Sequence, residues 1–163
     1  MMKVSQRHLA GWLIGILAVV PCIVNGQSST ASAPPMPDYH PSMGDLMTMA
    51  IQPRHTKLGL AGRQKNWTYA AYELSELRNA FTRIAHTIPT YRTMDTAAMI
   101  DAMTREPLAA LEQAIHGADA RGFNAAYERL TSACNGCHHS QDHAMVVIKI
   151  PHGEVYPDQD FAH

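Results

Sequence analysis

The residues with the clearest chemical potential lie near the C-terminus, in the stretch TSACNGCHHSQDH at 131–143. Two residues separate Cys134 from Cys137, and His138 follows directly. This C-x-x-C-H pattern is the attachment signature of c-type haem. Two thiols at that spacing reach two vinyl groups on one edge of the macrocycle, and the histidine reaches the iron from the same side. The pattern predicts one covalent haem c, with Cys134 and Cys137 as thioether links and His138 as the proximal axial ligand.

Other interpretations of the same stretch remain open. A zinc or copper site could take its ligands from the two cysteines together with His138, His139 and His143. Zinc sites usually draw on two separated clusters, however, and the sequence has no second pair of close cysteines. A thioredoxin-like redox pair would need a βαβ pattern around it. A structural disulfide would leave His138 without a role, so covalent haem is the favoured interpretation.

The N-terminus has the pattern of a secretory signal peptide, which predicts export to the periplasm. Lys3 and Arg7 precede a continuous apolar run at 9–20. This run is shorter than the roughly 20 residues that span a bilayer comfortably. We therefore expect residues 1–26 to be a cleaved signal peptide. A retained anchor is the alternative, and it would tether the domain to a membrane.

The cysteine content, the net charge and the types of motif present limit the functions that we expect. Cleavage would also remove Cys22, so that the motif would hold both cysteines of the mature chain. In an oxidising compartment two close thiols form a disulfide unless something else consumes them, and haem attachment does so. The formal net charge of -1 gives no reason to expect a nucleic-acid partner. The sequence also shows no catalytic acid–base pair, nucleophile arrangement or phosphate-binding loop, so we do not expect an enzyme.

The rest of the chain is predicted to form a helical domain between two extended segments. Residues 27–41 are rich in Ser and Pro and are expected to form a flexible linker. Segments with helical periodicity follow at about 41–61, 66–88, 95–116 and 119–138. Their lengths and short connections predict an all-α fold, an antiparallel four-helix bundle over residues 42–143. The tail at 144–163 is expected to begin as a short extended segment packed on the bundle and to end as a loose polar stretch.

Two prolines are expected to disturb these helices. Pro53 predicts a kink near Met49 or Ala50 in the first helix. Pro107 is expected to split the third helix, as the first residue of its second half. In the second helix Glu73 falls on the polar face, opposite the apolar residues.

The last helix is expected to turn the motif toward the core. Phe123, Tyr127, Leu130, Cys134 and Cys137 recur at spacings of four, three, four and three. That pattern is typical of one apolar face of a helix. Both cysteines are therefore predicted to lie on the buried face.

A four-helix bundle with C-x-x-C-H near the end of its last helix resembles the class II cytochromes c, also called the cytochrome c-prime type. The stretches MAIQPRHTKLGLAG, NWTYAAYELSEL and LTSACNGCHHS, and then VVIKIP, also look like a group of small exported bacterial cytochromes. The resemblance covers about residues 41–140 and implies a monohaem domain. By analogy it also allows a homodimer through helix faces. The tail after His143 departs from the class II pattern, in which little follows the haem helix.

The residue on the iron face opposite His138 would decide the function. In an antiparallel bundle the start of the first helix lies level with the end of the last. From a start near Pro41, Met47 lies about 9 Å along the axis and His55 about 21 Å, at roughly 1.5 Å per residue. Met47 is therefore the favoured distal ligand, with Met43 next by position and His55 as the alternative.

The distal ligand also separates two kinds of haem protein. A methionine or histidine in that position gives an electron carrier, whereas an apolar distal face leaves a site for nitric oxide or carbon monoxide. His143 and Met145 could serve only if the chain wrapped around the haem edge. We therefore expect a periplasmic electron-transfer protein that works with redox partner proteins. The alternatives are a five-coordinate haem protein that binds small gases, and a non-haem metal-binding or copper-binding protein.

Overall fold

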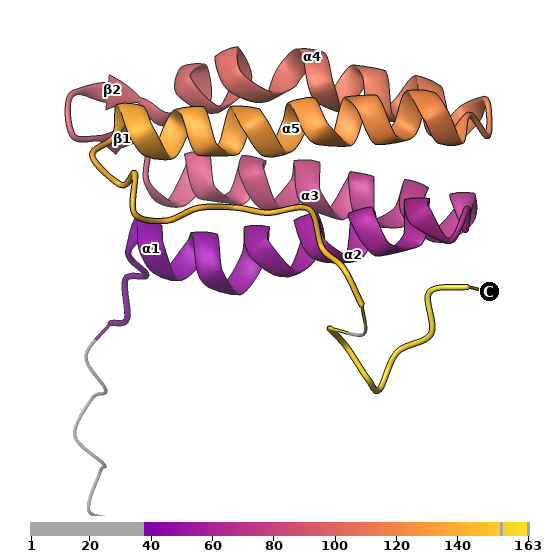
Figure 1. Cartoon of the computed structure of the whole chain (residues 1–163). Helices are drawn as coiled ribbons and strands as arrows, with labels where there is room; N and C mark the ends of the chain where they lie inside the picture. The colour runs from indigo at the N-terminus through magenta and orange to yellow at the C-terminus, as the bar shows by residue number, and fades with distance from the viewer. Residues whose placement is uncertain (1–37, 154, 163) are drawn as a thin grey trace, which may run out of the picture. The chain divides into compact units, whose positions relative to one another are not determined.

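The computed structural model describes residues 38–153 and 155–162, which form an antiparallel bundle of α-helices (Figure 1). In chain order the elements are α1 (Met43–Leu46), η1 (Met47–Ile51), α2 (Gln52–Arg63), α3 (Trp67–Thr87), β1 (Thr90–Tyr91), β2 (Met94–Asp95), α4 (Thr96–His116) and α5 (Ala120–Ser140). Because α1, η1 and α2 follow one another without a break, we call them the first rod. The predicted all-α bundle is confirmed. The predicted signal peptide and most of the predicted linker lie outside the described residues.

Side-chain caps fix where the helices begin. Ser42 and Asp45 form a capping box at the start of α1. Asn66, Asp95 and Asp119 each accept a hydrogen bond from a backbone N–H in the first turn of α3, α4 and α5. A cap of this kind satisfies a backbone donor that the helix leaves unpaired and contributes about 1 kcal/mol. The caps therefore help to set the register in which the helices meet.

The first rod contains a π-helical turn, η1, just before Pro53. Proline has no N–H, so Pro53 cannot donate to the carbonyl of Met49 four residues earlier. The N–H of Gln52 bonds the carbonyl of Met47, five residues back, which is the π-helical pattern. The structure therefore has a π-helical turn at the place where the sequence predicts a kink, near Met49 or Ala50. Such turns inside α-helices are frequent at functional sites.

The predicted split of the third helix is wrong, because α4 runs without a break through Pro107. A proline inside a helix removes one hydrogen bond and costs about 3 kcal/mol. Here Pro107 and Leu108 are both buried, and α4 packs along α5 (Figure 1). Packing of an apolar face supplies most of a helix's stability in proteins, and this accounts for the unbroken helix.

Two glycines let the first rod approach α5 closely. A Cβ atom added at Gly62 would lie 2.0 Å from the ring of Phe123, and one at Gly59 would lie 2.5 Å from the ring of Tyr127. Trp67 packs edge-on against the same Phe123 ring, with the centroids 5.9 Å apart. These contacts seat α2 on the helix that carries the C-x-x-C-H motif.

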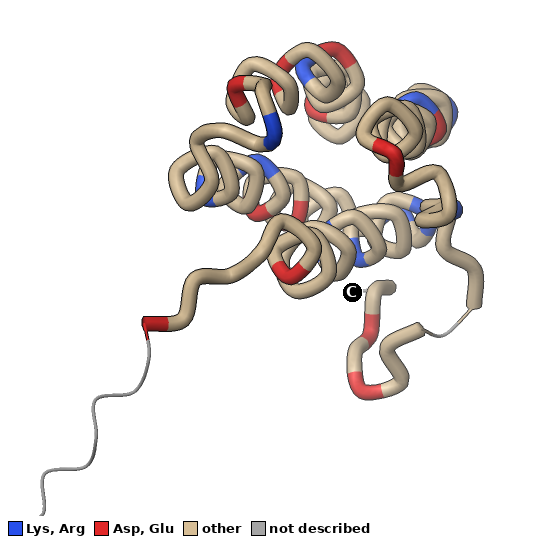
Figure 2. The backbone as a smooth tube through the Cα atoms, turned by 90° about the vertical axis from the view of Figure 1, so that its left-hand side faces the viewer, with Lys and Arg blue, Asp and Glu red and all other residues tan. Residues whose placement is uncertain are grey.

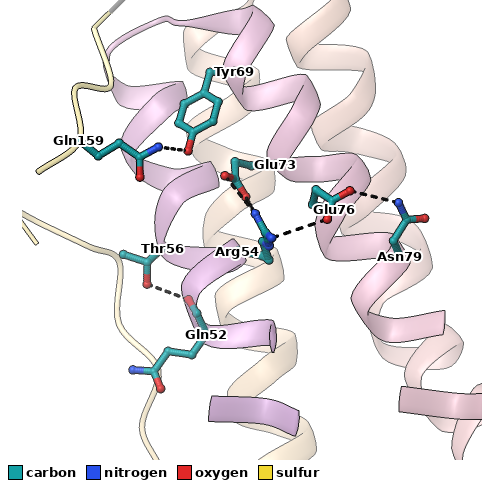
Figure 3. Close-up of polar contacts among 8 residues, drawn as sticks. All are labelled: Gln52, Arg54, Thr56, Tyr69, Glu73, Glu76, Asn79 and Gln159. Atoms are coloured by element: carbon teal, nitrogen blue, oxygen red, sulfur yellow. Dashed lines mark hydrogen bonds and ion pairs between the residues drawn. The ribbon is translucent and has the colours of Figure 1, made fainter. Parts of the chain in front are cut away.

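One residue assigned to a polar helix face is buried. Glu73 of α3 has no exposed surface, and its carboxylate lies 3.2 Å from the guanidinium of Arg54 in α2 (Figure 3). Arg54 also reaches Glu76, at 3.7 Å. A buried carboxylate must be paired to be tolerated, so Arg54 links α2 to α3. Periodicity alone could not identify this partner, because it lies on another helix.

A short hairpin of β1 and β2 joins α3 to α4, and helical periodicity does not anticipate it. It lies at the end of the bundle where α5 ends (Figure 1). There Arg92 forms an ion pair with Asp142 at 2.6 Å, and the hydroxyl of Tyr91 lies 2.9 Å from Nε2 of His143. The hairpin therefore holds the turn through which the chain leaves α5.

The tail turns back after α5 and runs along the bundle (Figure 1). As expected for an extended segment packed on the helices, Ile148 and Ile150 are half-buried, and Ile150 packs against the core. The end of the tail is also packed, so the expected loose ending is wrong. The centroid of the Phe161 ring lies 5.6 Å from that of Tyr69, and Gln159 donates to the Tyr69 hydroxyl (Figure 3).

Charged residues lie on each of the α-helices, whereas η1 has none. Figure 2 shows acidic and basic positions interspersed along them. Within residues 38–153 and 155–162, no helix is both long enough and apolar enough to cross a membrane.

Candidate covalent haem site

The last two turns of α5 carry the three motif residues. Cys134, Cys137 and His138 are spaced three and four apart, which places them on one side of the helix. All three are half-buried, and Cys134 packs against the hydrophobic core. The structure therefore brings the three residues together along one side of α5, partly turned into the bundle.

The two cysteines are free thiols with raised pKa values. Burial, and then the neighbouring Cys137, raises the pKa of Cys134 to about 11. Burial also raises the pKa of Cys137. Redox-active cysteine pairs instead rely on a lowered pKa, which supplies thiolate at neutral pH. This environment therefore disfavours a thioredoxin-like redox pair.

His138 has one ring nitrogen held by the backbone. Its Nδ1 lies 2.8 Å from the carbonyl oxygen of Val146 in the tail. A carbonyl can only accept a hydrogen bond, so Nδ1 must carry the proton and donate. In the neutral ring this leaves a lone pair on Nε2. A second hydrogen bond of this kind is what orients and tunes nearly all metal-ligating histidines.

Asn135, between the two cysteines, holds the same part of the tail. Its side-chain Nδ2 donates to the carbonyl of Ile148 at 2.9 Å, and its Oδ1 accepts from the N–H of Ile148 at 2.7 Å. The amide therefore pairs with both backbone groups of one residue. The sequence shows no signal for this role, because Asn135 is a variable position of the motif and its partner lies in a segment without regular structure.

The apolar side chains around the motif are less buried than those farther along the bundle. In α5 the fully buried positions end at Thr131, and in the first rod they begin only at Ile51. Between these limits the half-buried apolar residues that pack against the core are Met43, Leu46, Met47, Ala50, Ile100 and Cys134. At this end α5 and the first rod thus contribute half-buried apolar side chains, whereas Phe81 and Ile84 of α3 are buried.

A groove of about 620 Å³ lies at the same end of the bundle, between the second half of α3 and the first half of α4. Phe81, Ile100 and Leu108 form much of its apolar lining. Its volume is within the range of about 300–1,000 Å³ that is usual for pockets that hold small molecules and cofactors. The residues that line it belong to α3 and α4, and no motif residue of α5 is among them.

Met47, the favoured distal candidate, lies at the corresponding end of the first rod. It is the first residue of η1, is half-buried and packs against the core. Met43 shares these packing properties and lies one helical turn earlier, in α1. The start of the first rod and the end of α5 lie at the same end of the bundle (Figure 1).

His55, the alternative distal candidate, is held in a buried hydrogen-bonded group. Its Nε2 lies 3.0 Å from the hydroxyl of Thr131, and its Nδ1 lies 3.0 Å from the hydroxyl of Tyr127. Tyr127 also donates to the backbone carbonyl of His55 at 2.7 Å. Burial lowers the pKa of His55 to about 4, so its ring is neutral. Iron ligation by His55 would require one of these hydrogen bonds to break.

The candidates that follow the motif lie in different surroundings. His143 is held through Nε2 by the hydroxyl of Tyr91, whereas Met145 is 78% exposed. His139 is exposed on α5. Within the described part of the chain, no group of three or more His, Cys, Asp or Glu side chains is placed to hold a metal ion.

Comparison with known proteins gives no match. No family model, no curated protein and no solved structure resembles the chain significantly.

Proposed function

We propose that the protein is a monohaem c-type cytochrome that transfers electrons in the periplasm. The observation that carries the proposal is the hydrogen bond of His138, which follows Cys137 directly and has Nδ1 bonded to the Val146 carbonyl. In the neutral ring this leaves a lone pair on Nε2 for a metal. The motif alone could arise by chance. A ring that is already oriented and supplied with the usual outer hydrogen bond supports the haem interpretation independently.

The residues present fit a covalently attached haem. Cys134 and Cys137 would form the thioether links when their S–H groups add across the vinyl groups, and His138 would bind the iron through Nε2. The half-buried apolar side chains of the first rod and α4 would surround the macrocycle. When bound, the haem supplies reversible one-electron chemistry. The protein supplies the axial ligand, the apolar surroundings and the hydrogen bond to His138.

Met47 is the sixth ligand that the surroundings support best. It is half-buried and lies in a π-helical turn, whereas His55 has both ring nitrogens engaged. A thioether ligand on the iron favours an electron carrier with a raised reduction potential. The expected periplasmic location agrees with haem attachment outside the cytoplasm, and a redox protein of that compartment would be the partner.

A five-coordinate haem that binds nitric oxide or carbon monoxide is the second candidate function. The hydrogen bonds that hold His55 and His143 favour it, because they engage both histidines among the distal candidates considered above. A copper or zinc protein is less favoured, because the thiols of Cys134 and Cys137 are raised in pKa.

The visible spectrum of the reduced protein separates the two haem functions. We expect a sharp low-spin α-band that does not change when carbon monoxide is added. A broad high-spin spectrum that shifts with carbon monoxide would contradict electron transfer with a sixth protein ligand and support gas binding.

A further inference from the structure

The segment 144–150, which we call the return strap, contacts α5 at two positions inside the C-x-x-C-H motif. The carbonyl of Val146 accepts from Nδ1 of His138, and the backbone of Ile148 pairs with the side chain of Asn135. The strap reaches this place because the chain turns sharply after α5, where Asp142 has a φ of 61°. An ordinary helix end would leave His138 facing solvent rather than a fixed carbonyl.

Asn135 sets the register of the strap. Its amide offers one donor and one acceptor, which pair with both backbone groups of Ile148 as a neighbouring β-strand would. Burial of side chains provides little register here, because Met145, Val146 and Val147 are 78%, 47% and 62% exposed. When Ile148 is held in this position, the carbonyl of Val146, two residues earlier, lies within hydrogen-bond distance of Nδ1 of His138.

The acceptor on Nδ1 matters for the iron. A hydrogen bond from Nδ1 to a carbonyl makes the imidazole more basic and fixes the orientation of the ring. A more basic ligand stabilises the higher oxidation state of the iron, and it thereby lowers the reduction potential. Loss of the acceptor should therefore raise the potential without removing the axial ligand.

We propose that Asn135 is a positioning residue that sets the reduction potential by holding the return strap against His138. The inference rests on the proposed haem function and goes beyond it, because it assigns a role to a variable residue of the motif and to the tail. Asn135 itself would not touch the iron. It acts through Ile148, then Val146, then His138.

A purely structural role for the tail is the competing explanation, and the chain offers a matched control. Arg63 of α2 anchors the same tail farther along, where it donates to the carbonyl of Pro151 and lies 2.9 Å from Nδ1 of His152. We expect replacement of Arg63 to loosen the tail and to leave the Asn135–Ile148 pairing intact, because the two contacts involve different residues. A change of potential confined to Asn135 variants would therefore identify the positioning role.

The test uses the full-length chain produced with haem, comparing wild type with Asn135→Leu, Asn135→Ala and Arg63→Ala. We expect covalent haem in all four proteins, a more positive midpoint potential in both Asn135 variants and a wild-type potential in Arg63→Ala. Exchange of the Ile148 amide with solvent should also become faster in the Asn135 variants, which reports release of the strap.

Three results would overturn the inference. One is a wild-type potential in a haem-bearing Asn135 variant whose Ile148 amide exchanges rapidly. Another is an equal shift of potential in Arg63→Ala. If wild type itself carries no covalent haem, the proposed function and this inference fail together, whereas the first two results leave the proposed function intact.

Discussion

At the scale of single residues, the site depends on which histidine ring nitrogens already have hydrogen-bond partners in the protein. Nδ1 of His138 is bonded to a carbonyl, which leaves Nε2 for a metal. Both ring nitrogens of His55 lie 3.0 Å from hydroxyl groups, so iron ligation by His55 would disturb one of these contacts. The sequence identifies His138 by its place in the motif. It cannot tell which other histidines are already paired, because Thr131 and Tyr127 lie more than 70 positions from His55 in the chain.

The first prediction concerns Met47 as the distal ligand. We expect Met47→Ala to convert the haem from low spin to high spin and to open the iron to carbon monoxide, because the alanine side chain offers no ligand atom. Met49→Ala is the matched control, since Met49 lies in the same turn but is 60% exposed. Visible spectra of both variants provide the measurement. A low-spin spectrum in Met47→Ala would show that Met47 is not the distal ligand.

The second prediction concerns pH and His55. Its pKa is lowered to about 4 in the folded protein and is about 6.5 in an unfolded chain. Between these values the unfolded state binds the additional proton, so the stability that neutral His55 provides is complete above about pH 6.5 and is lost as the pH falls. We expect about 1.4 kcal/mol of the free energy of unfolding to be lost per pH unit in that interval.

Denaturant unfolding between pH 7 and about pH 4.5 tests this slope. His55→Gln should remove it, whereas His139→Gln should keep it, because His139 is exposed. An equally steep loss of stability in His55→Gln would mean that other groups cause the acid sensitivity.

At the scale of elements, close helix contacts place the first rod against α5. The third prediction is that Gly62→Ala destabilises the protein by about 1–3 kcal/mol, because overpacking forces neighbouring groups apart. The added Cβ would lie 2.0 Å from the Phe123 ring, which is itself almost fully buried. The measurement is the midpoint of thermal unfolding.

Gly44→Ala is the control for the Gly62 variant. The nearest atom to a Cβ at Gly44 is the hydroxyl oxygen of Ser42, at 3.7 Å, so only helix propensity changes. We expect its stability to be unchanged or slightly higher. Equal unfolding midpoints in the Gly62 and Gly44 variants would show that α2 and α5 can separate without cost.

Much of this element-scale arrangement could be predicted from the sequence. Apolar spacings of three and four give the helices and the side of α5 that carries Cys134. The continuity of α4 through Pro107 could not be predicted in this way, because it depends on packing against α5. Nor could the burial of Glu73, which depends on Arg54 from another helix.

At the scale of the whole molecule, α5 and the first rod are packed into the core except near the C-x-x-C-H motif, where their apolar side chains are half-buried. The tail joins the two, since it contacts Asn135 near one end of α5 and Arg63 at the far end of α2. Its docking could not be predicted from sequence, because single side chains rather than periodic patterns make the contacts. A covalent haem would cover the half-buried apolar side chains that α5 and the first rod carry near the motif.

Covalent attachment is the central claim, and intact mass spectrometry of the mature protein tests it most directly. The chain should be produced in cells able to mature c-type cytochromes, with Cys134→Ala/Cys137→Ala as the comparison. We predict that wild type retains the mass of one haem under denaturing conditions and that the double variant does not. A wild-type mass equal to that of the bare polypeptide would contradict the account.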